Sequence, residues 1–459
     1  MDVKDLFKDI ESYEGKSVTL EGWVRNNRSQ VSFGFIDFND GTYFKNLQLV
    51  YDNTLKDFDE ISKIRVGCAI KVTGTIVKSE GKGQSHELKV SSIVLLGDCP
   101  ENYPIQPKKH TREFLREMAY LRPRTNLYNA IFRVRSVAAQ AIHEYFAKNN
   151  YIYFNSPIIT GADCEGSGQM FEITTLDLDN LPKTEDGKVN YKKDLFGKKA
   201  YITGTGQLHG ETFAMAYKKI YTFGPTLRKE NSNTKTHANE FWMIEPEVAF
   251  CDLEGIMDIE EEMLKYIINT VLEKCPLELD FFSKYVENCL IEKLQKVVSR
   301  PFVRITHHDA VDLLKHSNVK WEFEPDYDSD IAKEHERYIT EFYNGPVFIK
   351  DWPKDIKSFY MKLNDDGRTV AAVDLEVPLA GELMGGSQRE DDYDKLITRM
   401  KELNIPIDNL DWYTNLRRFG GCYHSGFGLG FERLIMYLTG VDNIRDVIPY
   451  PRTPNNCDY

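Results

Sequence analysis

The sequence lacks the cysteine spacing of a disulfide framework or a zinc site. Its 8 cysteines are scattered along 459 residues, with no C-x-x-C pair and no regular interval. This pattern is typical of reduced thiols in a cytosol and argues against a zinc site. The sequence also has no apolar run near the roughly 20 residues that cross a bilayer, so we expect no membrane partner.

An excess of positive charge is also missing. The formal net charge is −13 at pH 7, which argues against a uniformly basic surface for nucleic acid but allows a local basic track. The start, MDVKDLFKDIESYEG, is acidic and amphipathic, unlike a secretory signal or an arginine-rich transit peptide. Because 41% of the residues are hydrophobic and 12% are aromatic, we expect a globular protein, located in the cytoplasm.

Short strands fill residues 16–97. They read SVTLEGWVR, FGFIDFND, LQLVYD, AIKVTGTIVK and ELKVSSIVLL, and several of them alternate apolar with polar residues. Five strands in so short a stretch predict a small closed β-barrel of the OB-fold type, whose open face often binds oligonucleotides. A barrel used only for protein contacts is the alternative.

A stretch with several prolines and many basic residues follows the barrel. Its basic side chains could follow a phosphate backbone; they are Lys108, Lys109, Arg112, Arg116, Arg122 and Arg124. Alternatively, the arginines pair with Glu113 and Glu117 on a solvated helix. The sequence therefore predicts a barrel domain at 1–100, a hinge at 101–125 and a larger domain at 126–459.

The larger domain mixes helices and strands. Residues 126–150 carry apolar side chains at helical spacing and predict a long helix, which is followed by a strand in YIYFNSPIIT. IYTFGPTLR and EFWMIEPEVAF predict two strands joined by a polar loop. Strands joined by hairpins rather than by helical crossovers indicate an antiparallel sheet flanked by helices, so the predicted fold class is α+β.

Near the end of the chain, GFGLGFERLIMYLTG (426–440) alternates glycine with large apolar residues. It is neither G-x-G-x-x-G nor a P-loop, because no Lys-Ser/Thr pair follows the glycines. Together with the helix and strand that end at Pro157, and with FGPTLRKENSNTKTHANEFWMIEPE, it resembles the three signature motifs of class II aminoacyl-tRNA synthetases. The resemblance implies that the glycines let the chain pass close beneath a nucleotide.

This resemblance implies an ATP site. Arg228 would grip the α-phosphate and the amino-acid carboxylate, because catalysis is then mostly positioning and charge stabilisation. Arg433 would stack on one face of adenine, since its guanidinium is planar and always charged, and Phe241 would cover the other face. Glu230, expected with Arg228 on the first strand, would meet the adenine or ribose edge. His237 would reach the terminal phosphates, unless it is an ordinary surface-loop histidine.

The resemblance also implies Mg²⁺ and an amino-acid site. Glu382, with Asp374 nearby, would hold Mg²⁺ through hard oxygen ligands, although a direct contact from Asp374 is left open. A barrel, a basic hinge and this core together resemble the subgroup of aspartyl, asparaginyl and lysyl enzymes. In that subgroup Glu165 would meet the substrate's ammonium with Gln207 beside it, and Arg389 would point at the side-chain oxygen.

Charge then indicates which amino acid is bound. Aspartyl enzymes carry a lysine where this sequence has Gly210, and usually an aspartate where it has Glu245. A carboxamide needs a donor for its oxygen and an acceptor for its NH₂, which Arg389 and Glu245 would supply. An aspartate facing Glu245 without the lysine would be repelled, because like charges in a closed site are costly.

The chain thus most resembles the asparagine-specific, bacterial members of the subgroup. This implies activation of L-asparagine with ATP and transfer to the 3′ end of tRNA(Asn), with release of AMP and diphosphate. Three alternatives stay open: an aspartate-specific or non-discriminating enzyme, a tRNA-independent asparagine synthetase, and a non-catalytic RNA-binding paralogue. The first motif usually forms a two-fold interface in this class, so a homodimer is expected. The polar stretch 177–199 has no assigned role.

In the barrel, the resemblance implies an anticodon platform. Phe35 would stack on an anticodon base and Gln48 would hydrogen-bond to its edge, because a splayed base exposes both a π-face and a pairing edge. Arg28 is a weaker candidate for a phosphate contact. The alternative for Phe35 is a place in the barrel core, since Phe33 and Phe38 lie close to it in the sequence.

Overall fold

The computed structural model describes residues 1–81, 83–162 and 170–459, and the chain divides into two compact units, 1–130 and 131–459. The expected hinge residues 101–125 belong to the first unit. Within the described residues, no helix combines the length and the apolar character that a bilayer crossing requires.

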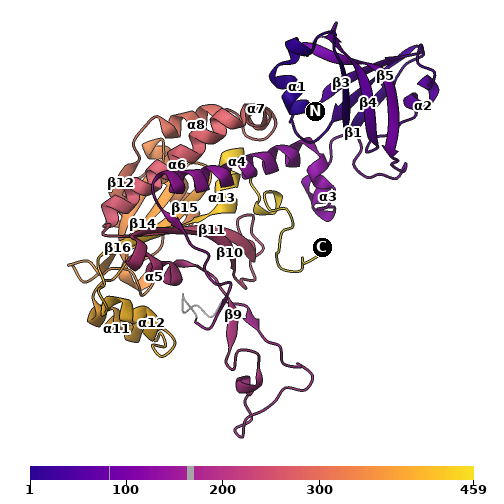
Figure 1. The fold of residues 1–459 in the computed structure, drawn as a ribbon. Coiled ribbons are helices and arrows are strands. Elements are labelled where there is room, and N and C mark those ends of the chain that lie inside the picture. Colours follow the sequence, from indigo (N-terminus) through magenta and orange to yellow (C-terminus); the bar gives the residue numbers. More distant parts are fainter. Residues whose placement is uncertain (82, 163–169) are drawn as a thin grey trace. The chain divides into compact units, whose positions relative to one another are not determined.

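The first unit is built on a closed barrel with the strand order β1-β2-β3-β5-β4 (Figure 1). Its strands are β1 (Ser17–Ser29), β2 (Phe33–Asn39), β3 (Leu47–Asp52), β4 (Ala69–Lys78) and β5 (His86–Gly97), and its helices are α1 (Val3–Lys8), α2 (Phe58–Ser62) and α3 (Arg112–Glu117). Inward and outward residues alternate along the strands, so that Leu20, Ile36 and Leu49 fill the interior. The predicted OB-fold is confirmed.

One residue of the expected phosphate track is not at the surface. Arg122 is fully buried, and its guanidinium lies 4.5 Å from the centre of the Tyr128 ring. The prediction is therefore wrong for Arg122, because a buried cation–π contact removes it from any phosphate backbone. Arg116 lies 3.6 Å from Glu113, as the alternative of a helical ion pair proposed.

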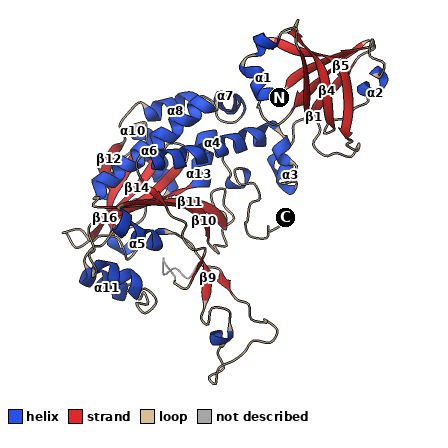
Figure 2. Ribbon diagram, in the orientation of Figure 1, coloured by secondary structure: helices blue, strands red, loops and turns tan. Residues whose placement is uncertain are grey.

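An eight-stranded sheet organises the second unit, in the order β12-β13-β14-β15-β16-β11-β10-β6 (Figure 2). Its strands are β6 (Ile152–Tyr153), β10 (Lys219–Leu227), β11 (Glu240–Ala249), β12 (Val303–Thr306), β13 (Val347–Pro353), β14 (Thr369–Val377), β15 (Gly381–Gln388) and β16 (His424–Gly430). The central pairings are antiparallel as predicted, whereas the pairs at the two edges, β12–β13 and β10–β6, are parallel. The strand expected over 151–160 contributes only Ile152–Tyr153 to this sheet.

Helices cover both faces of the sheet (Figure 1). The helix α6 (Leu253–Lys274) packs on β14, β15 and β16, while α5 (Gln207–Tyr217) packs on β10 and β11. The others are α4 (Asn126–Lys148), α7 (Pro276–Tyr285), α8 (Leu290–Val298), α9 (His307–Lys315), α10 (Lys333–Tyr343), α11 (Tyr393–Glu402), α12 (Asp411–Thr414) and α13 (Phe431–Thr439). The predicted long helix is confirmed as α4, and the α+β class with it.

A small second sheet carries the polar stretch that had no assigned role. It has the order β7-β9-β8, from β7 (Ile159–Thr160), β8 (Glu172–Ile173) and β9 (Ala200–Ile202). Residues 174–199 connect β8 to β9 as a long excursion, and Leu178, Leu195 and Phe196 are exposed on it. Nothing in the sheet of eight strands depends on this excursion for pairing.

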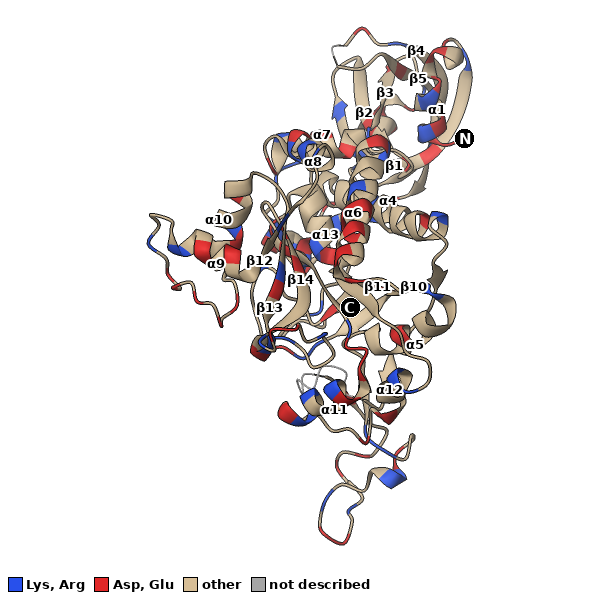
Figure 3. Cartoon of the chain, turned by 90° about the vertical axis from the view of Figure 1, so that its left-hand side faces the viewer, with Lys and Arg blue, Asp and Glu red and all other residues tan. Residues whose placement is uncertain are grey.

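One carboxyl group is buried where the helix α6 meets the sheet. Several acidic residues lie along this helix and appear as red bands on it in Figure 3. Most of them face solvent, but Glu260 is fully buried, and neither of its carboxyl oxygens has a hydrogen-bond partner in the described part of the chain. Burial, with a further contribution from the charge of Asp374, raises the pKa of Glu260 well above its ordinary range.

We expect the substitution Glu260→Met to stabilise the protein increasingly as the pH rises. The pKa of Glu260 is raised in the folded state, so its contribution to stability is fully present below its ordinary value of 4.5 and is lost as the pH increases. At pH 8 the variant should gain about 1–3 kcal/mol in free energy of unfolding, measured by urea denaturation. Glu273→Met, at an exposed site on the same helix, is the control and should change little. An equal gain at pH 5 and pH 8 would contradict this account.

Candidate active site

A pocket in the second unit gathers most of the predicted residues. It lies among β11, β15 and β16, with further residues from the loop after β10, from α5 and from the start of α13. Nine predicted residues line it: Gln207, Arg228, Glu230, His237, Phe241, Glu245, Glu382, Arg389 and Arg433. Asp374 does not line this pocket, and Glu165 lies outside the described residues. Segments far apart in the sequence therefore meet here because neighbouring antiparallel strands carry them.

Arg228 and Glu230 do not lie on a strand, in contrast to the prediction. The strand β10 ends at Leu227, and both residues fall in the loop that follows. The Asn239 side-chain amide donates to the backbone carbonyls of Arg228 at 2.8 Å and of Glu230 at 2.9 Å, which fixes the start of this loop. The Arg228 guanidinium lies 5.5 Å from the centre of the Phe241 ring. The loop thus places a cation beside an aromatic ring that β11 carries.

The rim of the pocket is rich in cationic groups. Arg433, near the start of α13, donates to the backbone carbonyl of Glu382 at 3.0 Å. His237 lies 3.9 Å from Glu230. Burial lowers the pKa of His237, Glu230 raises it, and the charges of Arg433, Lys333 and Arg228 lower it further. At neutral pH the imidazole is then uncharged, while the arginines around it supply the charge that phosphate groups require.

Two carboxylates converge beside the pocket. Asp374 Oδ1 and Glu382 Oε1 each lie 3.2 Å from the position that a Cβ atom on Gly385 would take, so both face the same open side of that glycine. Burial raises the pKa of Asp374 to about 6, with Lys357 opposing and Glu382 reinforcing the change. Lys357 donates to Asp374 at 2.5 Å. The described residues hold no group of three His, Cys, Asp or Glu side chains able to bind a metal unaided.

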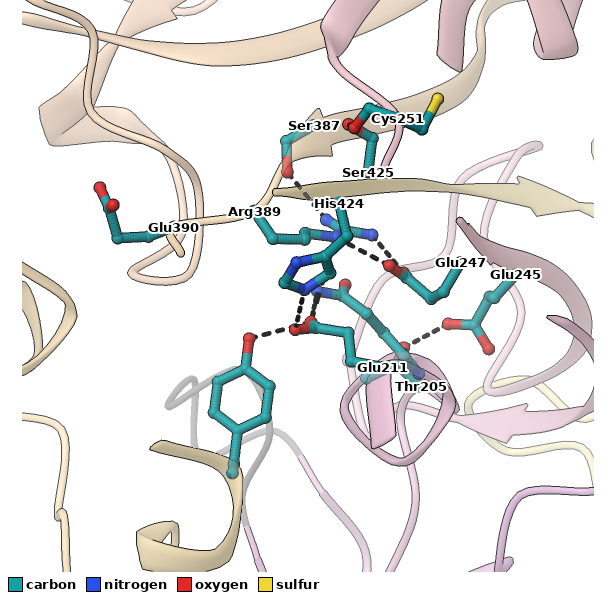
Figure 4. Close-up of polar contacts among 12 residues, drawn as sticks. Thr205, Glu211, Glu245, Glu247, Cys251, Ser387, Arg389, Glu390, His424 and Ser425 are labelled. Atoms are coloured by element: carbon teal, nitrogen blue, oxygen red, sulfur yellow. Dashed lines mark hydrogen bonds and ion pairs between the residues drawn. The ribbon is translucent and has the colours of Figure 1, made fainter. Parts of the chain in front are cut away.

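At the floor of the pocket Arg389 is already paired (Figure 4). It donates to both carboxylate oxygens of Glu247, at 2.5 Å and 3.2 Å, and to Ser387 Oγ at 2.8 Å. Both Glu247 oxygens accept from the guanidinium, a geometry that stabilises the ionised carboxylate, although burial and the charge of Glu211 raise the pKa of this group. Sequence reasoning missed Glu247. Its signal was the last glutamate of EFWMIEPE, which shares a strand face with Glu245 because side chains alternate.

Glu245 has a separate set of partners. Its carboxylate accepts from the Thr205 hydroxyl, from the Gly206 backbone N–H at 2.8 Å and from the Thr222 hydroxyl at 3.2 Å. Burial raises the pKa of Glu245, and these hydrogen bonds oppose the change. Arg389 and Glu245 both line the pocket, as the prediction requires, but in this structure Arg389 is bonded to Glu247 and not to Glu245.

One glycine of β16 makes room for a carboxylate, a purpose that the sequence did not indicate. A Cβ atom on Gly426 would lie 2.2 Å from Glu247 Oε1, so this glycine makes room for the carboxylate that binds Arg389. A Cβ atom on Gly428 would lie 2.7 Å from the end of the Met243 side chain. Of the glycines in β16, Gly428 and Gly430 line the pocket and Gly426 does not. On Gly210, where aspartyl enzymes carry a lysine, a Cβ atom would point toward Glu247 Cγ at 3.5 Å.

A second candidate site lies on the outside of the barrel, in the first unit. Phe35 is partly exposed on β2, whereas Phe38 is fully buried in the barrel core, so the core alternative is wrong for Phe35. The Arg28 guanidinium lies 5.8 Å from the centre of the Phe35 ring, and the two residues are cross-strand neighbours. Gln48 on β3 is also partly exposed and donates to Glu87 at 3.4 Å. An aromatic ring, a cation and an amide thus lie on the same face of the barrel strands β1, β2 and β3.

Comparisons with known proteins agree with this arrangement. Residues 18–96 match the family model of the OB-fold nucleic acid binding domain, and residues 111–454 match that of tRNA synthetases class II (D, K and N). The asparagine–tRNA ligase of Acholeplasma laidlawii is 56% identical over 99% of this chain and 98% of its own length. The asparagine–tRNA ligase of Clostridium novyi is 51% identical over 100% of this chain and 99% of its own length. The solved structure of asparaginyl-tRNA synthetase from Pyrococcus horikoshii, complexed with asparaginyl-adenylate, matches with a TM-score of 0.85 at 31% identity. The match covers 98% of this chain and 97% of that one.

We expect Gly426→Ala to destabilise the protein. The new methyl group would collide with the Glu247 carboxylate, and overpacking of a buried site costs about 1–3 kcal/mol. The urea midpoint of unfolding measures the effect. Gly224→Ala in β10 is the matched control, because no atom lies within 4 Å of its Cβ position. Equal midpoints for the two variants would show that Glu247 does not occupy the space above Gly426.

Proposed function

The chain belongs to the class II tRNA synthetases (D, K and N), and from that premise we propose that it activates L-asparagine with ATP and charges tRNA(Asn). One observation carries the choice of amino acid. Among the described residues that line the pocket floor, Arg389 is the arginine, and it is already bonded to the Glu247 carboxylate. The floor therefore offers directed N–H donors with little unbalanced positive charge. Such a floor suits a neutral carboxamide better than a second carboxylate.

In the first step, a carboxylate oxygen of asparagine attacks the α-phosphorus of ATP. The bond from that phosphorus to the bridging oxygen breaks, and diphosphate leaves with the electron pair. Arg228 holds the α-phosphate and the attacking carboxylate, because a fixed cation stabilises the charge that develops between them. Adenine lies between Phe241 and Arg433, and Glu230 and His237 contact the ribose or adenine edge and the terminal phosphates.

Mg²⁺ would be held by Glu382 and Asp374, whose oxygens open to the same side of Gly385. Two hard carboxylate ligands fit this ion, which usually takes its other ligands from phosphate oxygens and water. When bound, Mg²⁺ neutralises charge on the phosphates. Lys357 positions Asp374 through its 2.5 Å hydrogen bond.

The side chain of asparagine would be read by two groups. Arg389 donates to the carboxamide oxygen and Glu245 accepts from the NH₂ group, while Gln207, with Glu165 from outside the described residues, meets the ammonium. An aspartate would place a second carboxylate beside Glu245, and the absence of a lysine at Gly210 leaves that repulsion uncompensated.

In the second step, a ribose hydroxyl at the 3′ end of tRNA(Asn) attacks the carbonyl carbon of the adenylate, and AMP leaves. The barrel binds the anticodon, with Phe35 stacked on a base, Gln48 at its edge and Arg28 near a phosphate. Residues 101–125 serve as the hinge between this domain at 1–100 and the catalytic domain at 126–459. The enzyme acts as a homodimer in the cytoplasm.

The proposed specificity predicts a clear outcome in ATP–diphosphate exchange. With asparagine the exchange should be rapid, and with aspartate it should be at least about a hundredfold slower, since a buried like-charge contact costs several kcal/mol. Purified protein is assayed with each amino acid in turn, without tRNA. Equal rates with the two amino acids would indicate a non-discriminating or aspartate enzyme. Absence of exchange with both would indicate a non-catalytic paralogue.

Two substitutions separate the two proposed sites. Arg433→Ala should reduce asparagine-dependent exchange at least about a thousandfold, because it removes both the stacking plane and a charge, while tRNA binding stays within about threefold of wild type. Phe35→Ala should do the reverse: exchange persists, and tRNA affinity falls about tenfold through the lost stacking. Exchange kinetics and filter binding of tRNA(Asn) measure the two effects. Unchanged tRNA binding in Phe35→Ala would refute the anticodon assignment.

A further inference from the structure

A second buried carboxylate lies behind Arg389, outside the pocket. Glu211, in the helix α5, is fully buried and does not line the pocket. Four side chains donate to its carboxylate: Gln207 at 3.1 Å, Tyr413 at 2.9 Å, Arg417 at 2.9 Å and His424 at 2.9 Å. So many hydrogen bonds on one buried carboxylate hold it in one position and in its charged form.

The charges around Glu211 stabilise its ionised state. Burial alone raises the pKa of Glu211, but Arg417, His424 and Arg389 outweigh this effect and lower it below its ordinary range. The Glu211 carboxylate lies 4.0 Å from the Arg389 guanidinium, which places a negative charge beside the group that faces the substrate. Figure 4 shows the Glu247 carboxylate beside the Arg389 guanidinium and the Glu211 carboxylate beside the His424 ring.

Charges of both signs therefore lie at the floor of the pocket and directly behind it. Arg389 and Arg417 carry two positive charges, and Glu211 and Glu247 carry two negative charges. Each ring nitrogen of His424 also faces an acceptor oxygen, of Cys422 at 2.8 Å and of Glu211. At distances near 4 Å in a buried site, removal of one charge is felt strongly by its neighbours. The balance determines the potential that an incoming side chain meets.

We propose that Glu211 is a specificity-determining positioning residue: its charge offsets Arg417 and part of Arg389, and so keeps the floor from attracting aspartate. This inference rests on the proposed function. Without the Glu211 charge, Arg389 keeps its ion pair with Glu247 but Arg417 loses the carboxylate it is paired with, and the excess positive charge reaches the pocket through Arg389. An aspartate carboxylate gains from that charge, whereas the neutral carboxamide does not.

A structural role and a specificity role give different results. If Glu211 only supported the pocket, its loss would weaken the use of both amino acids in the same proportion. If its charge determines selectivity, the ratio of kcat/KM for aspartate to that for asparagine must rise. The ratio is thus the informative measurement, and total activity is not.

The test compares Glu211→Gln with Tyr413→Phe in ATP–diphosphate exchange. Glu211→Gln removes the charge and keeps the shape, and we expect the aspartate-to-asparagine ratio of kcat/KM to rise at least about tenfold. Tyr413→Phe removes one hydrogen bond from the same carboxylate but keeps its charge, so its ratio should equal that of wild type. In the double variant Glu211→Gln/Arg417→Met, which restores the charge balance, the ratio should return to within about threefold of wild type.

The outcomes are distinguishable from those for the proposed function. Wild-type protein that fails to use asparagine would refute the proposed function, whatever Glu211 does. An unchanged ratio in Glu211→Gln, or an equal rise in Tyr413→Phe, would overturn the role of Glu211. If Glu211→Gln does not fold, Glu211→Met carries the same charge change with an apolar side chain and must show the same rise.

Discussion

The buried ion pair between Arg389 and Glu247 is the interaction on which the rest of the site depends. It fixes the only arginine at the pocket floor within the described lining, and it sets the direction of the guanidinium that remains for a substrate. A buried pair of this kind adds little to stability by itself, because desolvation offsets most of the attraction. The pair instead fixes a position: it holds the Arg389 guanidinium so that its remaining N–H groups point in set directions.

The fold is arranged so that this pair can form. Glu247 lies on β11 and Arg389 follows β15, and β16 lies between these strands with a glycine, Gly426, directly under the carboxylate. The same sheet carries Glu245 into the pocket from a neighbouring position on β11. Arg228, in the loop after β10, and Arg433, in α13, line the same pocket. The charged groups of the pocket thus lie on, or directly after, a few neighbouring strands.

Much of this could be predicted from the sequence, and the exceptions have physical causes. The barrel strands were evident because inward and outward residues alternate, and nine of the predicted residues do share one pocket. The partner of Arg389 was not evident, because Glu245 and Glu247 share one face of a strand and only the glycine beneath decides which carboxylate fits. Glu211 and Glu260 were missed because charged side chains usually face solvent. Arg122 was misassigned for the same reason.

The most direct test of the central claim is a crystal structure of the chain with a non-hydrolysable asparaginyl-adenylate analogue. We expect Arg389 to keep both bonds to Glu247 while it donates to the carboxamide oxygen, and the carboxamide NH₂ to face Glu245. Arg389 released from Glu247, or a lysine in contact with the terminal oxygen of the side chain, would contradict the account.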